Sequence, residues 1–114
     1  RRALRSNGPE QGRTVIEAGA LRIDLAARTV DRGGERVHLT PTEFDLLATL
    51  ASNAGRVLTH GFLFTTVWKG RVFGDAQAHL RVHVAHLRRK LEDDPVRPRH
   101  LQTELGVGYR FVTD

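Results

Sequence analysis

Cysteine is absent from this 114-residue sequence, which excludes disulfide bonds and cysteine-ligated zinc fingers. The absence fits a reducing compartment, and we expect the protein to be cytoplasmic. No apolar run approaches the roughly 20 residues that a membrane-spanning helix needs. The basic start at residues 1–5 leads into polar residues and not into the apolar stretch of a signal peptide. We therefore expect no membrane partner.

Motifs of enzymatic chemistry are also missing. The sequence has no nucleophile elbow, no phosphate-binding loop and no convergent pair of acids. Glu43 and Glu104 have structural explanations, because Glu43 completes a helix capping box and Glu104 lies in a predicted strand. We expect no catalytic residue and no cofactor.

What the chain does have is an excess of positive charge. Eighteen Lys and Arg against thirteen Asp and Glu give a net charge of +5. Such an excess attracts a polyanion to any face on which it is concentrated, so nucleic acid is the first partner to consider. The length and a hydrophobic content of 39% suit one domain with a single core.

The first thirteen residues differ in composition from the rest. They include four arginines, two glycines and Pro9 but almost no apolar side chain, so they bury too little surface to offset the entropy of ordering them. We interpret residues 1–13 as an interdomain linker or a disordered terminus, and residues 14–114 as one domain. The chain begins without methionine, which suggests a piece of a longer protein.

Short apolar segments that alternate with polar residues fill residues 14–39. Leu21, Ile23 and Leu25 alternate with charged residues, and Gly19 and the pair at 33–34 mark turns. The pattern predicts a small antiparallel sheet of three or four strands with one apolar face.

Two helix starts follow the predicted sheet. Thr40 and Glu43 form a capping box around Pro41, and this first helix is expected to stop at residues 53–55. After an extended segment at 56–58, Thr59 can cap a second helix that ends at residues 69–70. Four side chains of the second helix are expected in the core: Phe62, Leu63, Val67 and Trp68.

A third helix is predicted from about Gln77 to Glu92, before two strands at 100–104 and 109–113 joined by a glycine-rich tip. Its solvent face carries no carboxylate before Glu92, whereas a solvated helix normally mixes both signs of charge. DNA is the natural complement of this basic face. One stripe of apolar side chains should dock the helix on the core, namely Leu80, Val84, Leu87 and Leu91.

Two alternatives to DNA binding remain. His79, His83 and His86 have the i, i+4, i+7 spacing of a helical metal site, but such a site needs a further ligand from elsewhere, so we expect no bound metal. A winged helix that binds only protein would instead expose Phe62, Phe64 or Phe73 to its partner.

Four segments together resemble the effector domain of OmpR/PhoB-type response regulators. They are residues 39–47, residues 67–68, residues 82–91 and residues 106–111, and the likeness covers residues 16–112. The resemblance implies an α+β winged helix-turn-helix fold, with an N-terminal four-stranded antiparallel sheet, three helices and a C-terminal β-hairpin wing. It also implies a transcription factor of a two-component system whose receiver domain precedes Arg1.

The resemblance implies several partners. They are double-stranded DNA with direct repeats, a second copy bound in tandem, and RNA polymerase, which would contact the loop between the second and third helices. In this sequence the residues of that loop are Lys69, Gly70, Arg71 and Asp75.

Candidate DNA contacts follow from the outward faces of the helix and wing. Direct base contacts are expected from His79, Val82, Ala85 and His86. The hairpin tip carries Leu105 where many relatives have an arginine, so a contact between wing and base is in doubt. Phosphate contacts are expected from Thr59, His60, Trp68, Arg81, His83, Arg88, Arg89, Gly106, Gly108 and Arg110.

Overall fold

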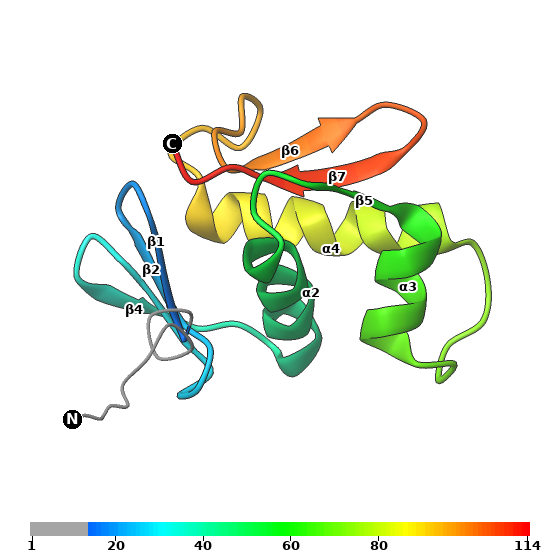
Figure 1. The fold of residues 1–114 in the computed structure, drawn as a ribbon, viewed down its shortest axis with the longest axis horizontal. Helices are drawn as coiled ribbons and strands as arrows, with labels where there is room; N and C mark the ends of the chain where they lie inside the picture. The colour runs from blue at the N-terminus through cyan, green and yellow to red at the C-terminus, as the bar shows by residue number, and fades with distance from the viewer. Residues whose placement is uncertain (1–13) are drawn as a thin grey trace.

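The computed structural model describes residues 14–114, and the linker predicted for residues 1–13 lies outside the described part. A four-stranded sheet at one end of the domain is followed by three helices and a three-stranded sheet (Figure 1). The α+β class and the order of elements predicted from the sequence are confirmed.

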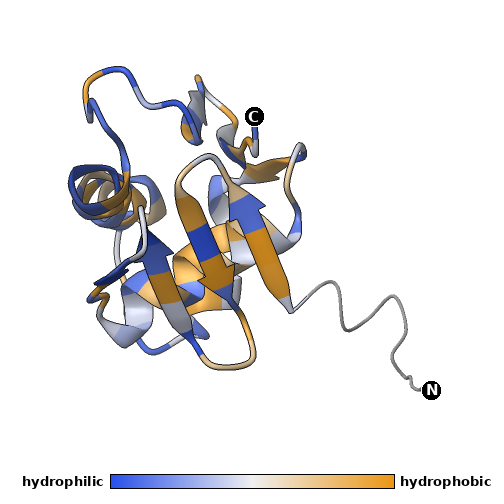
Figure 2. Ribbon diagram, turned by 90° about the vertical axis from the view of Figure 1, so that its left-hand side faces the viewer, coloured by the Kyte–Doolittle hydropathy of each residue, from blue (hydrophilic) through white to orange (hydrophobic). Residues whose placement is uncertain are grey.

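The first sheet is an antiparallel meander. Its strands are β1 (Val15–Ala18), β2 (Leu21–Asp24), β3 (Thr29–Arg32) and β4 (Glu35–Val37), hydrogen-bonded in that order. Gly33 and Gly34, with φ of 58° and 85°, form the left-handed two-residue turn that lets β3 and β4 pair closely. Hydrophobic and hydrophilic bands follow one another along the strands (Figure 2), and the buried members of the sheet are Ala18, Leu21, Ile23 and Val30.

Helix α2 (Pro41–Ser52) begins where the sequence predicts. The Thr40 hydroxyl accepts a hydrogen bond from the Glu43 N–H at 3.1 Å, and Glu43 Oε1 accepts one from the Thr40 N–H at 3.0 Å. This reciprocal capping box satisfies two backbone donors that a helix end otherwise leaves free. The helix ends at Asn53 before Gly55, whose φ of 86° turns the chain away.

Two further helices complete the helical layer. Helix α3 (His60–Trp68) is capped by Thr59, and helix α4 (Ala76–Leu91) is capped by Asp75, whose Oδ1 accepts from the Gln77 N–H at 2.9 Å. The predicted stripe of α4 is confirmed, because its buried residues are Leu80, Val84, Leu87 and Leu91.

The prediction that Phe62 lies in the core is wrong. Phe62 is 49% exposed, although Leu63, Val67 and Trp68 of the same helix are buried as expected. At about 100° per residue, Phe62 lies on the face of α3 that also carries the exposed Thr65, away from the buried stripe.

The second sheet contains one strand more than the predicted hairpin. Strand β5 (Val57–Thr59) is the extended segment between α2 and α3, and it pairs with β7 (Gly108–Phe111), which also pairs with β6 (Leu101–Glu104). Gly108 is required here, because a Cβ at this position would lie 1.8 Å from the Leu58 carbonyl oxygen. The wing is thereby attached to the segment that enters α3.

The end of α4 is attached to the wing by a buried carboxylate. Glu92 Oε1 accepts a hydrogen bond from the Arg99 N–H at 2.8 Å, and Oε2 accepts from the N–H groups of His100 and Leu101 at 2.9 and 2.8 Å. Arg88, one turn earlier, donates to the Leu101 carbonyl oxygen through Nε and Nη2 at 2.9 and 2.6 Å. The backbone N–H and C=O of Leu101 are thus both bonded to side chains at the end of α4, those of Glu92 and Arg88.

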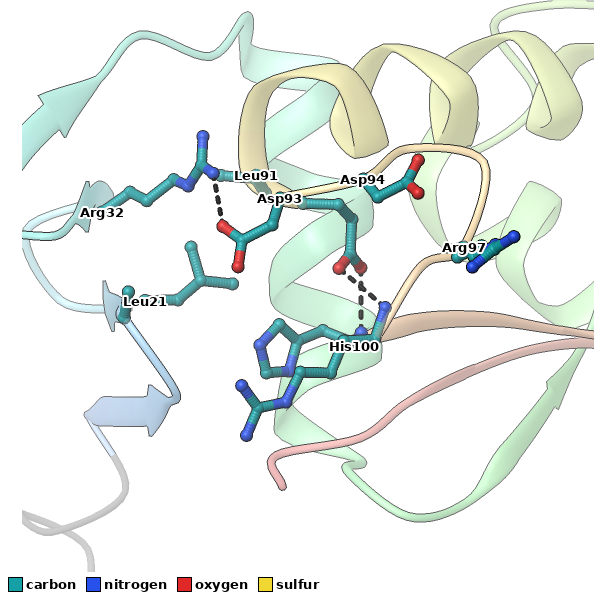
Figure 3. A pocket seen from close by; sticks show the side chains of 10 residues that line it. Leu21, Arg32, Leu91, Asp93, Asp94, Arg97 and His100 are labelled. Atoms are coloured by element: carbon teal, nitrogen blue, oxygen red, sulfur yellow. Dashed lines mark hydrogen bonds and ion pairs between the residues drawn. The ribbon is translucent and has the colours of Figure 1, made fainter.

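A shallow pocket of about 280 Å³ lies beside this attachment, between the first sheet and the loop after α4. Figure 3 shows Arg32 of β3 turned toward Asp93, and the two side chains form an ion pair at 2.6 Å. His100 closes the other side, where its Nδ1 donates to the Val112 carbonyl oxygen at 2.7 Å. The pocket marks where the first sheet meets the start of the wing.

We predict that replacing Glu92 with Gln destabilises the domain by roughly 2 to 3 kcal/mol, because one amide oxygen cannot accept from three N–H groups, two of them buried. Urea unfolding should show a lower midpoint with an unchanged slope. The matched control is Glu35→Gln on exposed β4, which should leave the midpoint in place. Equal midpoints for E92Q and E35Q would contradict this role of Glu92.

Candidate nucleic-acid interface

Helix α4 presents a basic face with little acidic charge. Val82 is 52% exposed, and Arg81 and Arg89 are exposed beside it. Ala85 and His86 are partly buried on the same side, and no carboxylate lies within the helix. This face offers apolar contact at its centre and cations on both sides.

The start of α4 packs on α3 through an aromatic cluster. The rings of Phe64 and Trp68 stack at 5.2 Å, and His79 lies 5.5 Å from Phe64. His83 meets Trp68 edge-on at 5.0 Å. Trp68 is only 6% exposed, so its main role here is to hold the two helices together.

His83 has a fixed tautomer. Its Nδ1 lies 2.9 Å from the His79 carbonyl oxygen, which can only accept, so Nδ1 carries a proton. In the neutral ring Nε2 is therefore an acceptor. Because phosphate also only accepts, the contact predicted for His83 requires a protonated imidazole.

Glu43 connects the start of α2 to α4. Its side chain is 5% exposed, and Oε1 accepts from Lys90 Nζ at 2.7 Å in addition to the capping-box bond. Oε2 lies 3.5 Å from Nδ1 of His86, whose side chain is 40% exposed. Burial raises the pKa of Glu43, but the Lys90 hydrogen bond, the Thr40 N–H and the charges of Lys90 and His86 outweigh it and lower the pKa overall.

Arg88 points into the domain toward the wing. Besides the Leu101 carbonyl, its Nη2 donates to the Thr103 hydroxyl at 2.8 Å. Burial lowers the pKa of Arg88, and Tyr109 and Glu92 oppose this shift. The sequence indicated a phosphate contact for Arg88 but gave no sign of this bond to β6.

The wing carries few free donors. Arg110 forms an ion pair with Glu104 on the neighbouring strand, and Gly108 is buried in the middle strand. Gly106 is exposed at the tip beside Leu105, which is 91% exposed. Of the predicted phosphate contacts in the wing, only Gly106 therefore lies open at the surface.

The remaining predicted contacts lie around α3. Thr59 is exposed, and its hydroxyl accepts from the Phe62 N–H at 3.1 Å. The His60 N–H donates to the Val107 carbonyl at 3.1 Å, and its ring lies edge-on to Tyr109 at 5.7 Å. This segment touches both the wing and the helix layer.

The loop between α3 and α4 is largely exposed. Lys69 adopts a left-handed conformation with φ of 53°, followed by Gly70, and Arg71 Nη2 donates to the Val67 carbonyl at 3.3 Å. Phe73 at its centre is 89% exposed, and Asp75 ends the loop by capping α4.

Residues 14–114 contain neither a metal-binding cluster nor a membrane-spanning helix. No group of three His, Cys, Asp or Glu side chains in this range is arranged to hold a metal ion, so the three histidines of α4 do not converge. No helix in the same range has the length and apolar character to cross a membrane.

A helical layer, a basic third helix and an adjoining β-hairpin define a winged-helix domain. Known proteins agree: the family profile "Transcriptional regulatory protein, C terminal" matches residues 34–111. The chain belongs to this family, the C-terminal effector domains of OmpR/PhoB-type response regulators. These are domains of transcription factors and not enzymes.

Two relatives are about twice as long as this chain. The chain is 51% identical over 98 residues to the KDP operon transcriptional regulatory protein KdpE of Escherichia coli K12, covering 86% of this chain and 43% of the relative. It is 47% identical over 113 residues to KdpE of Mycobacterium tuberculosis, covering 97% and 50%. The chain thus spans about half the length of these relatives.

Solved structures show the same fold. The response regulator DrrB of Thermotoga maritima, an OmpR/PhoB homologue, superposes with a TM-score of 0.79 at 37% identity, covering 87% of this chain and 44% of DrrB. The DNA-binding domain of Klebsiella pneumoniae RstA, solved in complex with the RstA box, gives 0.77 at 34% identity, covering 88% and 98%.

We predict that Glu43 contributes acid-sensitive stability. Because its pKa is lowered on folding, the contribution is present above the unfolded value near 4.5 and is lost as the pH falls through the folded value. The free energy of unfolding of wild type should exceed that of Glu43→Gln by about 1 kcal/mol at pH 7, since the glutamine keeps the cap and the hydrogen bond from Lys90 but loses the attraction between the carboxylate charge and Lys90. Urea unfolding between pH 3 and 7 measures the difference, and a gap that persists at pH 3 would contradict it.

Proposed function

We propose that this domain binds double-stranded DNA in a sequence-specific way, as the output domain of a two-component response regulator that controls transcription. The observation that carries the proposal is the exposed face of α4, which presents Val82, Arg89 and, on its flank, Arg81, with no carboxylate in the helix. A major groove is about 12 Å wide and admits one helix with such a face.

The contacts divide by position on α4. Val82, Ala85 and His86 on the outward side are proposed to read bases, together with the partly exposed His79 at the edge of the cluster on α3. Val82 and Ala85 are suited to thymine methyl groups. Arg81 and Arg89 are proposed as the main phosphate contacts, because both are exposed and neither side chain takes part in a hydrogen bond or ion pair described for residues 14–114. A protonated His83 would add a third.

The other predicted contacts lie outside the exposed face of α4 or are held by protein partners. Thr59, His60 and the exposed Gly106 are proposed to approach the DNA backbone beside the groove. Arg88 and Arg110 are held by protein partners, so we propose that they position the wing relative to α4. Trp68 and Gly108 are left out of the interface because both are buried.

The proposal extends to partners outside this chain. The RstA domain was solved with its DNA box, which supports duplex DNA as the ligand here. We further propose tandem binding of two copies to direct repeats, contact of RNA polymerase with residues 69–75, and control by a receiver domain of the same cytoplasmic protein. The exposed Phe73 gives the loop an apolar group for such a protein contact.

We predict that Arg89→Ala weakens binding to every duplex alike and reduces the dependence of log K on log salt by about one. Arg81→Ala should do the same. The matched control is Arg22→Ala on the first sheet, where the side chain pairs with Glu17 away from α4. Titrations at several salt concentrations measure the slopes, and a slope that stays the same in R89A would refute the phosphate contact.

A second candidate is a winged helix that binds only protein, favoured by exposed Phe62 at 49% and Phe73 at 89%. Duplex titration separates the two candidates. We expect wild type to bind random-sequence duplex with a salt-dependent affinity, which binding through these apolar side chains does not supply. Absence of duplex binding at low salt would favour the second candidate.

A further inference from the structure

The one partly exposed histidine of α4 that faces a buried carboxylate is His86. Its Nδ1 lies 3.5 Å from Glu43 Oε2, while Glu43 Oε1 is occupied by the Thr40 N–H and by Lys90. Lys90 bonds the same carboxylate, and the ring centre of His83 lies 6.0 Å from that of His86 on the same helix. Glu43 therefore supplies the acceptor on the inner side of the ring.

The ionised carboxylate of Glu43 can only accept hydrogen bonds and cannot donate one. Its lowered pKa keeps Glu43 ionised at neutral pH, and its burial strengthens its field at the nearby ring nitrogen. This favours the neutral tautomer of His86 in which Nδ1 carries the proton. Nε2 is then left bare on the 40% exposed side chain, as an acceptor for a ligand.

We propose that Glu43 is a positioning residue for base recognition, because it fixes the tautomer of His86 and so makes Nε2 an acceptor toward DNA. This proposal rests on the proposed function, in which His86 reads a base. In the major groove an acceptor pairs with the exocyclic amino groups of cytosine or adenine, and it faces unfavourable lone pairs at guanine O6 or thymine O4.

Replacing Glu43 with Gln tests the proposal sharply, because the two side chains have almost the same shape. The amide oxygen must take the place of Oε1, where both neighbours are donors, and glutamine also serves in a capping box. The amide NH₂ is then left facing His86 Nδ1. A donor at this place favours the opposite tautomer, with the proton on Nε2.

The first measurement needs no DNA. Nitrogen-15 spectra of the imidazole rings, at a pH where His86 is neutral, should show the Nδ1–H tautomer in wild type and the Nε2–H tautomer in E43Q. The matched control Glu35→Gln removes one carboxylate from exposed β4 and should leave the wild-type tautomer. An Nε2–H tautomer in wild type would overturn the proposal even if E43Q failed to fold.

The second measurement is selection from random duplexes with wild type, E43Q, E35Q and His86→Ala. Wild type and E35Q should prefer cytosine or adenine at one position, H86A should lose that preference, and E43Q should shift it toward guanine or thymine. E43Q should also bind the wild-type duplex about fivefold more weakly, the worth of one hydrogen bond. A purely structural role of Glu43 would weaken binding without changing the base.

The outcomes separate the two proposals. If wild type selects no sequence, the proposed function fails and this inference fails with it. If wild type and E43Q select the same base while H86A changes it, the role of Glu43 is wrong and the proposed function stands. A base that depends on both His86 and Glu43 supports the inference.

Discussion

The proposed binding surface depends on the hydrogen bonds that join the end of helix α4 to the backbone of Leu101, the first residue of β6. Glu92 accepts three successive backbone N–H groups at the start of β6, and Arg88 holds the Leu101 carbonyl from the other side. Charged side chains on both backbone polar groups of one residue, Leu101, fix both the distance and the direction between helix and strand. The wing cannot turn against α4 without breaking buried, charge-assisted hydrogen bonds, so helix and hairpin meet a ligand as one body.

A second buried carboxylate, that of Glu43, holds helix α2 against helix α4. Glu43 closes the capping box of α2, pairs with Lys90 and lies next to His86. Glu43 holds Lys90, and Arg88 is held separately by the Leu101 carbonyl, so two of the seven potential cations of α4 have protein partners. His83 Nδ1 is bonded to the His79 carbonyl, and His86 Nδ1 faces Glu43. The surface left for DNA is smaller and more differentiated than its total charge suggests, with Arg81, Val82 and Arg89 exposed on it.

Local patterns predicted most of the fold because the interactions behind them span only a few residues. The capping box at Thr40, the cap at Thr59 and the helical period of the core stripe of α4 need no knowledge of the rest of the chain. Phe62 was predicted in the core because its residue type is apolar. It is exposed because α3 turns its other face inward, and that orientation is set by α2 and α4.

By itself, the sequence determined the class of domain, the helix with the basic face and which of its residues form the core stripe, since composition, period and caps act locally. Only the tertiary structure decided which cations of that helix remain free, that β5 joins the wing around Gly108, and that Glu43 meets His86 across two helices. The reason is the distance along the chain. Glu43 and Lys90 are 47 residues apart, and Arg88 and Leu101 are 13 apart, so no local pattern reports their contact.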